Sequence, residues 1–272
     1  MEDIFQLLLE CPEEKIEDII LERAKQLEDA PSTERKIIIP NESLYGYKSY
    51  YHGFIKSDVK IFSSMGNSDD ECYTLGNYDY LISFFKFIRD SNISNKNDAI
   101  ISLATFMDQY FGEYCGIDQR ADYLKKYDGE ATIDVFKGMG LAACSERAAV
   151  ANNILTMLGA NAYFISGEVN GEQHAFNIIL NKKNQFRLVD TTSCCGLYDS
   201  NNNLVGKTTY INNLGEINDK LEGFLLNEQP LKFYDMIARI DANGKIKYEG
   251  NGKIKQYQAE PILLDETKNK SH

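Results

Sequence analysis

The chain has 272 residues, of which 43% are apolar and 26% charged, a composition typical of folded globular proteins. Its 41 acidic and 29 basic residues give a net charge of -12, which repels phosphate backbones and anionic membrane surfaces. Nucleic acid is therefore excluded as an expected partner. No stretch has the roughly 18 apolar residues that a membrane span needs, so we expect no membrane association.

The amino-terminal residues carry acids where a secretory signal would carry Lys or Arg, and Glu10 and Pro12 interrupt their apolar run. We therefore expect a soluble, cytoplasmic protein. The six cysteines form no CxxC pair, so in a reducing compartment we expect free thiols, with neither a disulfide framework nor a zinc site. For the adjacent Cys194 and Cys195, ordinary thiols are the favoured interpretation, and a vicinal disulfide is the alternative.

Residues 3–29 show two short helix patterns joined at Cys11-Pro12. In the second pattern, apolar residues recur at helical spacing from Ile16 to Leu27 while acids fill the outer face, which predicts a docking helix. Residues 36–63 carry two apolar runs around a Tyr-rich loop. Within that loop, residues 43–54 are either a substrate-binding loop or a packed aromatic surface.

Helical patterns follow at residues 77–90 and 97–114, and we expect another helix within 130–140 that ends at glycines. The pattern over residues 145–158 is the clearest helix, because apolar positions fall on one face and a glycine suits its carboxyl end. Cys144 therefore stands at the start of a buried helix.

Three strand patterns come next, at residues 161–169, 172–180 and 185–192. Beyond an Asn-rich loop we expect a mostly helical stretch to about residue 236. A hairpin over residues 236–249 then follows, because its Asn-Gly dipeptide favours a tight turn. The order of one helix and three strands predicts an α+β fold.

Cys144 is a candidate nucleophile, because a helix amino terminus and a nearby imidazole both favour the thiolate. Of the three histidines, His272 is terminal and His52 lies in the Tyr-rich loop, which leaves His174. Asp190, on the next strand, is the carboxylate that would orient this imidazole. Each residue alone has an ordinary structural interpretation, as a core thiol, a core histidine or a strand-ending carboxylate.

The pairing of the two strands decides whether the histidine and the aspartate meet. Paired residue numbers that sum to 364 would place His174 directly opposite Asp190 on one face of the sheet. A sum of 365 would place the two side chains on opposite faces and break the site. The candidate site therefore requires an odd number of loop residues between the strands.

The ordered set resembles the transglutaminase-like superfamily of papain-like cysteine enzymes, in which a cysteine begins a helix, a histidine opens one strand and an aspartate closes the next. The matching segments are GMGLAACSERAAVANNILTMLGANAYFISGEV, HAFNIIL and FRLVDTT, within residues 97–195. The resemblance implies a papain-like core, in which the cysteine-bearing helix packs on an antiparallel sheet. It also implies a catalytic triad of Cys144, His174 and Asp190.

The chain departs from the family pattern at several positions. Three residues separate Gly140 from the cysteine where one is usual, and Phe176 and Thr191 replace a common Trp and a common Pro. In many relatives a Trp, Tyr or Gln of an upstream helix supplies the second oxyanion donor. Since this chain has no Trp, Gln109 and Tyr110 are the candidates for that role.

The resemblance implies acyl transfer from the amide bonds of a protein or peptide through a thioester intermediate, without a metal or an organic cofactor. We expect hydrolysis, by a peptidase, amidase or deamidase, because neither a propeptide nor a calcium loop is present to restrain free transfer to lysine. A protein-glutamine transglutaminase is the first alternative, and a non-catalytic binding module of the same fold is the second.

The same reasoning divides the chain into two regions. Residues 1–90 form an amino-terminal accessory region of helical and mixed character. Residues 91–272 form the transglutaminase-like catalytic domain, with a carboxyl-terminal helix and hairpin. The sequence leaves the oligomeric state open.

Overall fold

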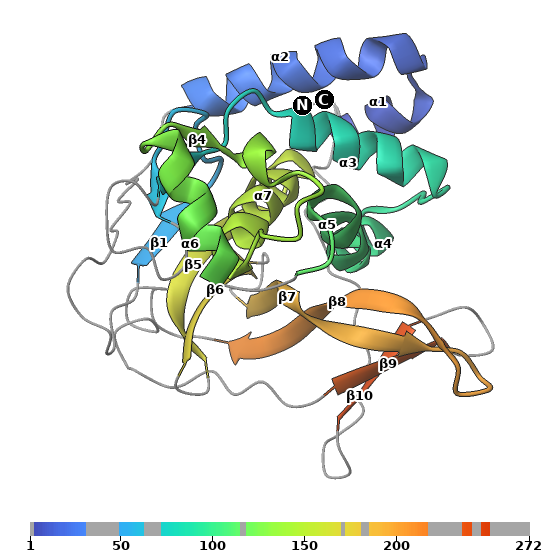
Figure 1. Ribbon diagram of the computed structural model, residues 1–272. Coiled ribbons are helices and arrows are strands. Elements are labelled where there is room, and N and C mark those ends of the chain that lie inside the picture. The colour runs from blue at the N-terminus through green and yellow to red at the C-terminus, as the bar shows by residue number, and fades with distance from the viewer. Residues whose placement is uncertain are drawn as a thin grey trace.

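Figure 1 shows a computed structural model of the chain, in which helices cover one face of a large and mostly antiparallel sheet. This arrangement is the α+β class that the sequence patterns predict. The structure describes residues 3–30, 49–62, 72–114, 118–169, 172–180, 185–216, 236–240 and 246–250. In this part of the chain, none of the helices has both the length and the apolar character that a membrane span requires.

The helix patterns of residues 3–29, 77–90 and 97–114 are confirmed. The last of them is divided at Ser102, whose hydroxyl donates to the carbonyl oxygen of Ala99. Within the described residues the α-helices are α1 (Ile4–Glu10), α2 (Ile16–Asp29), α3 (Asp79–Asp90), α4 (Lys96–Ile101), α5 (Leu103–Phe111), α6 (Asp118–Leu124) and α7 (Cys144–Met157).

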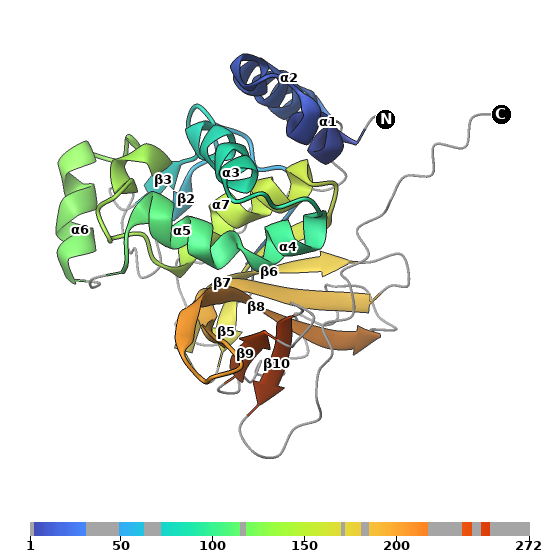
Figure 2. The same cartoon turned by 90° about the vertical axis from the view of Figure 1, so that its right-hand side faces the viewer.

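The amino-terminal helices pack on the outside of the helical layer. Ile16, Ile20 and Ala24 of α2 are fully buried, and α2 lies against α3 (Figure 2). Arg89 of α3 donates to the carbonyl oxygen of Cys11 at 2.7 Å, which attaches the junction of α1 and α2. The apolar stripe of α2 is therefore covered by the protein's own core.

The large sheet has the strand order β1-β5-β6-β7-β9-β10, and β8 also pairs with β7. All its pairs are antiparallel except that of β7 with β9. Its strands are β1 (Ser49–His52), β5 (Asn161–Val169), β6 (Glu172–Leu180), β7 (Gln185–Tyr198), β8 (Leu204–Glu216), β9 (Met236–Ile240) and β10 (Ile246–Gly250). A smaller sheet contains β2 (Ile61–Phe62), β3 (Cys72–Thr74) and β4 (Ala131–Thr132).

Helix α7 occupies the centre of the molecule. It packs against β5, β6 and β7 on one side and against α3 on the other (Figures 1 and 2). Every residue of α7 except Thr156 is buried. The helix begins at Cys144, as predicted, and Gly159 follows its end with φ +91°, a conformation that glycine adopts without steric cost.

One hydrophobic core spans both regions into which we divide the chain. Its buried residues run from Phe5 to Val189, and strand β1 of the amino-terminal region pairs with β5. The proposed boundary between residues 90 and 91 therefore lies within a shared core and a shared sheet.

Two of the secondary-structure predictions are wrong. The segment 130–140 contains strand β4 and a 3-10 turn at Ile133–Phe136 in place of a helix, because β4 pairs with β3 of the small sheet. Residues 204–216, expected to be helical, form β8, which pairs along β7. Their β-branched Thr208 and Thr209 favour a strand in this position, where both hydroxyls donate to the carbonyl oxygen of Ile101.

Other predictions fall partly outside the described residues. The Tyr-rich segment 43–54 ends in the edge strand β1, with Tyr51 and Phe54 buried, whereas residues 43–48 lie outside the described part. The rest of the expected helical stretch, residues 217–235, also lies outside it. The hairpin over 236–249 is confirmed by the antiparallel pairing of β9 with β10.

Candidate active site

Cys144 is the first residue of α7 and lies against the sheet. The preceding residue, Ala143, has an extended backbone and caps the helix. Cys144 is buried and packs with Ala148 of the next turn, with Ala175 of β6 and with Phe164 of β5. The thiol therefore lies at the positive end of the helix dipole, beside the strand residue that follows His174.

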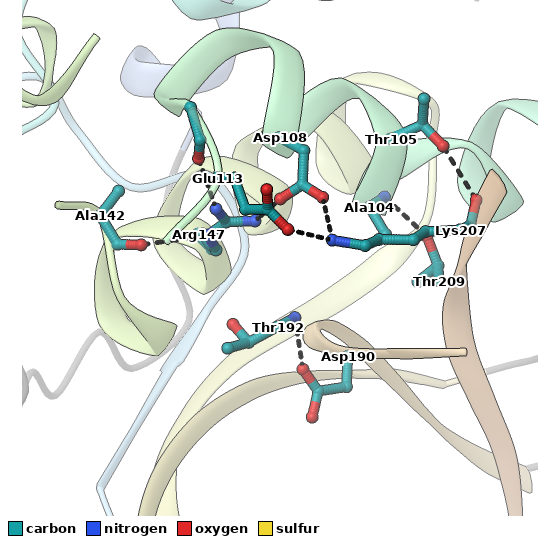
Figure 3. Close-up of polar contacts among 11 residues, drawn as sticks. Ala104, Thr105, Asp108, Glu113, Ala142, Arg147, Asp190, Thr192, Lys207 and Thr209 are labelled. Carbon is teal, nitrogen blue, oxygen red and sulfur yellow. Dashed lines mark hydrogen bonds and ion pairs between the residues drawn. The ribbon is translucent and has the colours of Figure 1, made fainter. Parts of the chain in front are cut away.

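His174 and Asp190 are joined by a hydrogen bond. Nε2 of His174 lies 2.7 Å from Oδ2 of Asp190, which is completely buried. The other carboxylate oxygen, Oδ1, accepts the backbone N–H of Thr192 at 2.8 Å, as Figure 3 shows. Because Asp190 is held in this way, it fixes the orientation of the imidazole.

The register of β6 and β7 differs from the one that would place the two side chains directly opposite. Asn177 pairs with Val189 and Leu180 with Phe186, so the paired residue numbers sum to 366 and not to 364. Since the shift is two residues, His174 and Asp190 still share one face, but they meet diagonally. Residues 181–184, which connect the two strands, lie outside the described part.

The surroundings of His174 favour its charged form. Burial alone would lower its pKa, but the hydrogen bond to Asp190, a hydrogen bond to Cys144 and the negative charges of both partners raise the pKa to about 10. Because Nε2 of His174 binds Asp190, we assign the hydrogen bond with the sulfur of Cys144 to Nδ1. The site therefore has the arrangement that supports a thiolate–imidazolium pair.

The first turn of α7 contains three buried polar side chains that the sequence analysis missed. Ser145 is hydrogen-bonded to the hydroxyl of Tyr73 at 3.0 Å. Glu146 pairs with Arg120 of α6 at 2.5 Å, and both side chains are almost completely buried. The sequence holds a signal for two of them, since Glu146 and Arg147 are the only charged residues among 144–157, too few for a solvated helix face.

The third of these side chains, Arg147, contacts the end of α5. Its Nη1 donates to Oδ1 of Asp108 at 2.7 Å and its Nη2 to the carbonyl oxygen of Gly112 at 3.0 Å. Lys207 of β8 lies 3.1 Å from the other oxygen of Asp108 and 3.3 Å from Glu113 (Figure 3). This ion-pair network joins α7, α5 and the sheet beside the candidate site.

The turn before Cys144 packs closely on the same end of α5. The N–H groups of Gly138 and Gly140 donate to the carbonyl oxygens of Tyr110 and Phe111, at 2.9 and 2.7 Å. A Cβ atom at Gly112 would lie 2.9 Å from the backbone nitrogen of Gly140, so the contact requires glycine at this position. The three residues that separate Gly140 from the cysteine therefore follow an anchored turn.

The two residues considered for the second oxyanion donor have other surroundings. The hydroxyl of Tyr110 donates to Oδ1 of Asp134 at 2.9 Å, and the ring lies under the ammonium of Lys137. Gln109 is exposed on α5. Phe176, which replaces the common Trp, lies alongside the ring of His174 with a centroid distance of 6.2 Å.

Two further cysteines and the possible metal ligands can be placed only within the described residues. Within the described ranges, no group of three or more His, Cys, Asp or Glu side chains is placed to hold a metal ion. Cys11 and Cys72 are buried cysteines. The side chains of Cys194 and Cys195 lie outside the described part.

Comparisons of the chain with protein-family models, with curated proteins and with solved structures found no match.

Proposed function

We propose that the protein is a cysteine-nucleophile acyl-transfer enzyme with a transglutaminase-like core, which acts on amide bonds through a thioester intermediate. One observation carries the proposal: Cys144 begins a buried helix, and the imidazole hydrogen-bonded to its sulfur is held by a buried carboxylate at 2.7 Å. A core thiol or a core histidine alone would not require a thiol, an imidazole and a carboxylate joined one after another by hydrogen bonds.

In the proposed reaction, the Cys144 thiolate attacks the amide carbonyl carbon, and the carbonyl oxygen becomes an oxyanion. The backbone N–H of Cys144, at the start of α7, is the donor that we expect to stabilise this charge. The imidazolium of His174 then transfers its Nδ1 proton to the leaving amine as the C–N bond breaks. Asp190 keeps the ring oriented and offsets its positive charge throughout.

The thioester is resolved when a nucleophile attacks its carbonyl carbon. His174, now neutral, takes a proton from that nucleophile, and the sulfur leaves as thiolate. We propose that water is the nucleophile, so that the enzyme is a peptidase, amidase or deamidase of a protein or peptide substrate. The same triad would serve an amine acceptor, and transglutaminase activity is therefore the alternative outcome of the test.

A single experiment tests peptide cleavage, deamidation and amine transfer together. The full chain is incubated with a glutamine-containing peptide, a plain peptide mixture and a fluorescent primary amine, and the products are followed by mass spectrometry. Cleaved or deamidated peptides without incorporated amine, absent in Cys144→Ala, would support hydrolysis. Dominant amine incorporation would identify a transglutaminase. Unchanged peptides, together with slow and uniform alkylation of all six thiols, would favour a non-catalytic binding module.

A further inference from the structure

Two consecutive side chains of α7 hold opposite ends of one peptide group. Nε of Arg147 donates to the carbonyl oxygen of Ala142 at 3.1 Å. The carboxylate of Glu146 accepts the N–H of Ala143 at 2.9 Å through Oε2. The carbonyl of Ala142 and the N–H of Ala143 belong to the same planar peptide unit, so its orientation is set at both ends.

Each of the two side chains is fixed by a different element. Glu146 uses its second oxygen, Oε1, to bind Arg120 of α6. Arg147 uses its two remaining nitrogens to bind Asp108 and Gly112 at the end of α5. Figure 3 shows the guanidinium of Arg147 between Ala142 and Asp108. Neither side chain can rotate without breaking a buried, charge-assisted hydrogen bond.

We propose that Glu146 and Arg147 are positioning residues, which we call the peptide clamp, and that they orient the backbone N–H of Cys144 toward the oxyanion. The proposal rests on the proposed function. The clamped unit is adjacent to the Ala143–Cys144 peptide, and the extended backbone of Ala143 is the only joint between the two units. The carbonyl oxygen of Ala143 accepts the backbone N–H of Arg147 at 3.1 Å, so the helix holds the Ala143–Cys144 peptide from one side and the clamped unit from the other. Displacement of the clamped unit would therefore shift the N–H of Cys144 from its position beside the reacting carbonyl.

The clamp also explains why the turn tolerates three residues between Gly140 and the cysteine. Leu141, Ala142 and Ala143 are all buried, yet their apolar side chains cannot set the orientation of a peptide plane. Oppositely charged side chains at both ends of the plane do so, because a hydrogen bond to a charged group is directional and strong. A positioning error of about 1 Å at a reacting group can cost a factor near 10² in rate.

The test compares two reactions of the same sulfur. With iodoacetamide, an S–C bond forms and iodide leaves, so the rate reports the thiolate but involves no oxyanion. With 4-nitrophenyl acetate, an S–C bond forms through a tetrahedral oxyanion, and 4-nitrophenolate leaves with the electron pair of the broken C–O bond. The ratio of the acylation rate to the alkylation rate isolates the stabilisation of the oxyanion.

Arg147→Lys keeps the positive charge beside Asp108 but removes the planar donors that reach Ala142 and Gly112. We expect this ratio to fall about tenfold or more, with the pH dependence of alkylation unchanged. Asp108→Asn, which weakens the anchor of Arg147 at a partly exposed site, is the second variant and should lower the ratio less. Glu113→Gln removes an exposed contact of the same network and should leave both rates unchanged.

A folded Arg147→Lys or Asp108→Asn protein with the parent ratio would overturn the clamp. A parallel loss of acylation and alkylation would also overturn it, because a purely structural role predicts that result. Failure of the proposed function looks different, since Cys144 of the unmodified protein would then react with both reagents no faster than an ordinary thiol.

Discussion

The two ends of α7 bury different kinds of side chain. From Ala148 to Leu155 the helix buries small and apolar residues and two uncharged polar ones, Asn152 and Asn153, and it packs against β5, β6 and β7. The first turn instead buries Ser145, Glu146 and Arg147, each held by a polar group from another element. Apolar burial stabilises the fold, whereas buried ion pairs add little net stability and demand exact geometry. This difference supports our proposal that the first turn positions Cys144.

The largest expected effect follows from Cys144→Ala, which removes the nucleophile from the first turn. We expect amide turnover to fall by about 10⁴-fold or more, because the remaining groups cannot form a thioester. The thermal midpoint should change little, since only one sulfur atom is lost at the edge of the core. His174→Ala should have a similar effect on turnover, and near-normal activity in that variant would contradict the mechanism.

Asp190→Asn should lower turnover by about 10²- to 10⁴-fold, because an amide can orient His174 but cannot stabilise its cation. Steady-state kinetics with a peptide amide would measure the loss. The matched control is Thr192→Ala, which keeps the backbone N–H that binds Asp190 and should retain most activity. Equal losses in the two variants would point to a general disturbance of β7.

Glu146→Gln should destabilise the protein by about 3–5 kcal/mol, because it leaves the buried Arg120 without its anionic partner. The double variant Arg120→Met, Glu146→Leu removes both charges and should recover most of that stability. It should not recover acylation by 4-nitrophenyl acetate, because the N–H of Ala143 has lost its acceptor. The free energy of unfolding in urea and the acylation rate would be measured for each variant. Recovery of both quantities in the double variant would contradict a positioning role for Glu146.

At the other end of the helix, Leu155→Ala should cost about 2–5 kcal/mol in the free energy of unfolding, because it leaves a cavity in the core. The folded fraction should keep its turnover rate per molecule. Thr156→Ala, at the one position of α7 that is not buried, is the matched control and should cost much less. A large loss of turnover in folded Leu155→Ala protein would show that the two ends of the helix are not functionally distinct.

A further expected effect is a pH dependence of stability. The pKa of His174 is about 10 in the folded protein, above the usual value of 6.5. Its charge therefore contributes stability that is complete below pH 6.5 and is lost as the pH rises to about 10. The difference in unfolding free energy between the parent protein and His174→Gln should shrink across this interval. A constant difference would exclude a raised pKa.

Much of the site was predictable because the signals are local. Gly159 follows the carboxyl end of the helix 144–157, and the predicted bounds of β5 and β6 agree with the structure at both ends. A period of two or of 3.6 residues depends only on neighbours in the chain. The order of Cys144, His174 and Asp190 on these elements therefore follows from the sequence.

Tertiary structure decided the contacts between distant segments. The partners of the first turn, Arg120 and Asp108, lie 26 and 39 residues from the side chains that they bind, and no periodicity relates them. The two-residue shift between β6 and β7 likewise leaves the pattern of each strand unchanged. Residues 204–216 form the strand β8 because they pair with β7, and a local sequence pattern cannot reveal that pairing. Local sequence determined where each candidate group stands on its element, and long-range packing determined which groups meet.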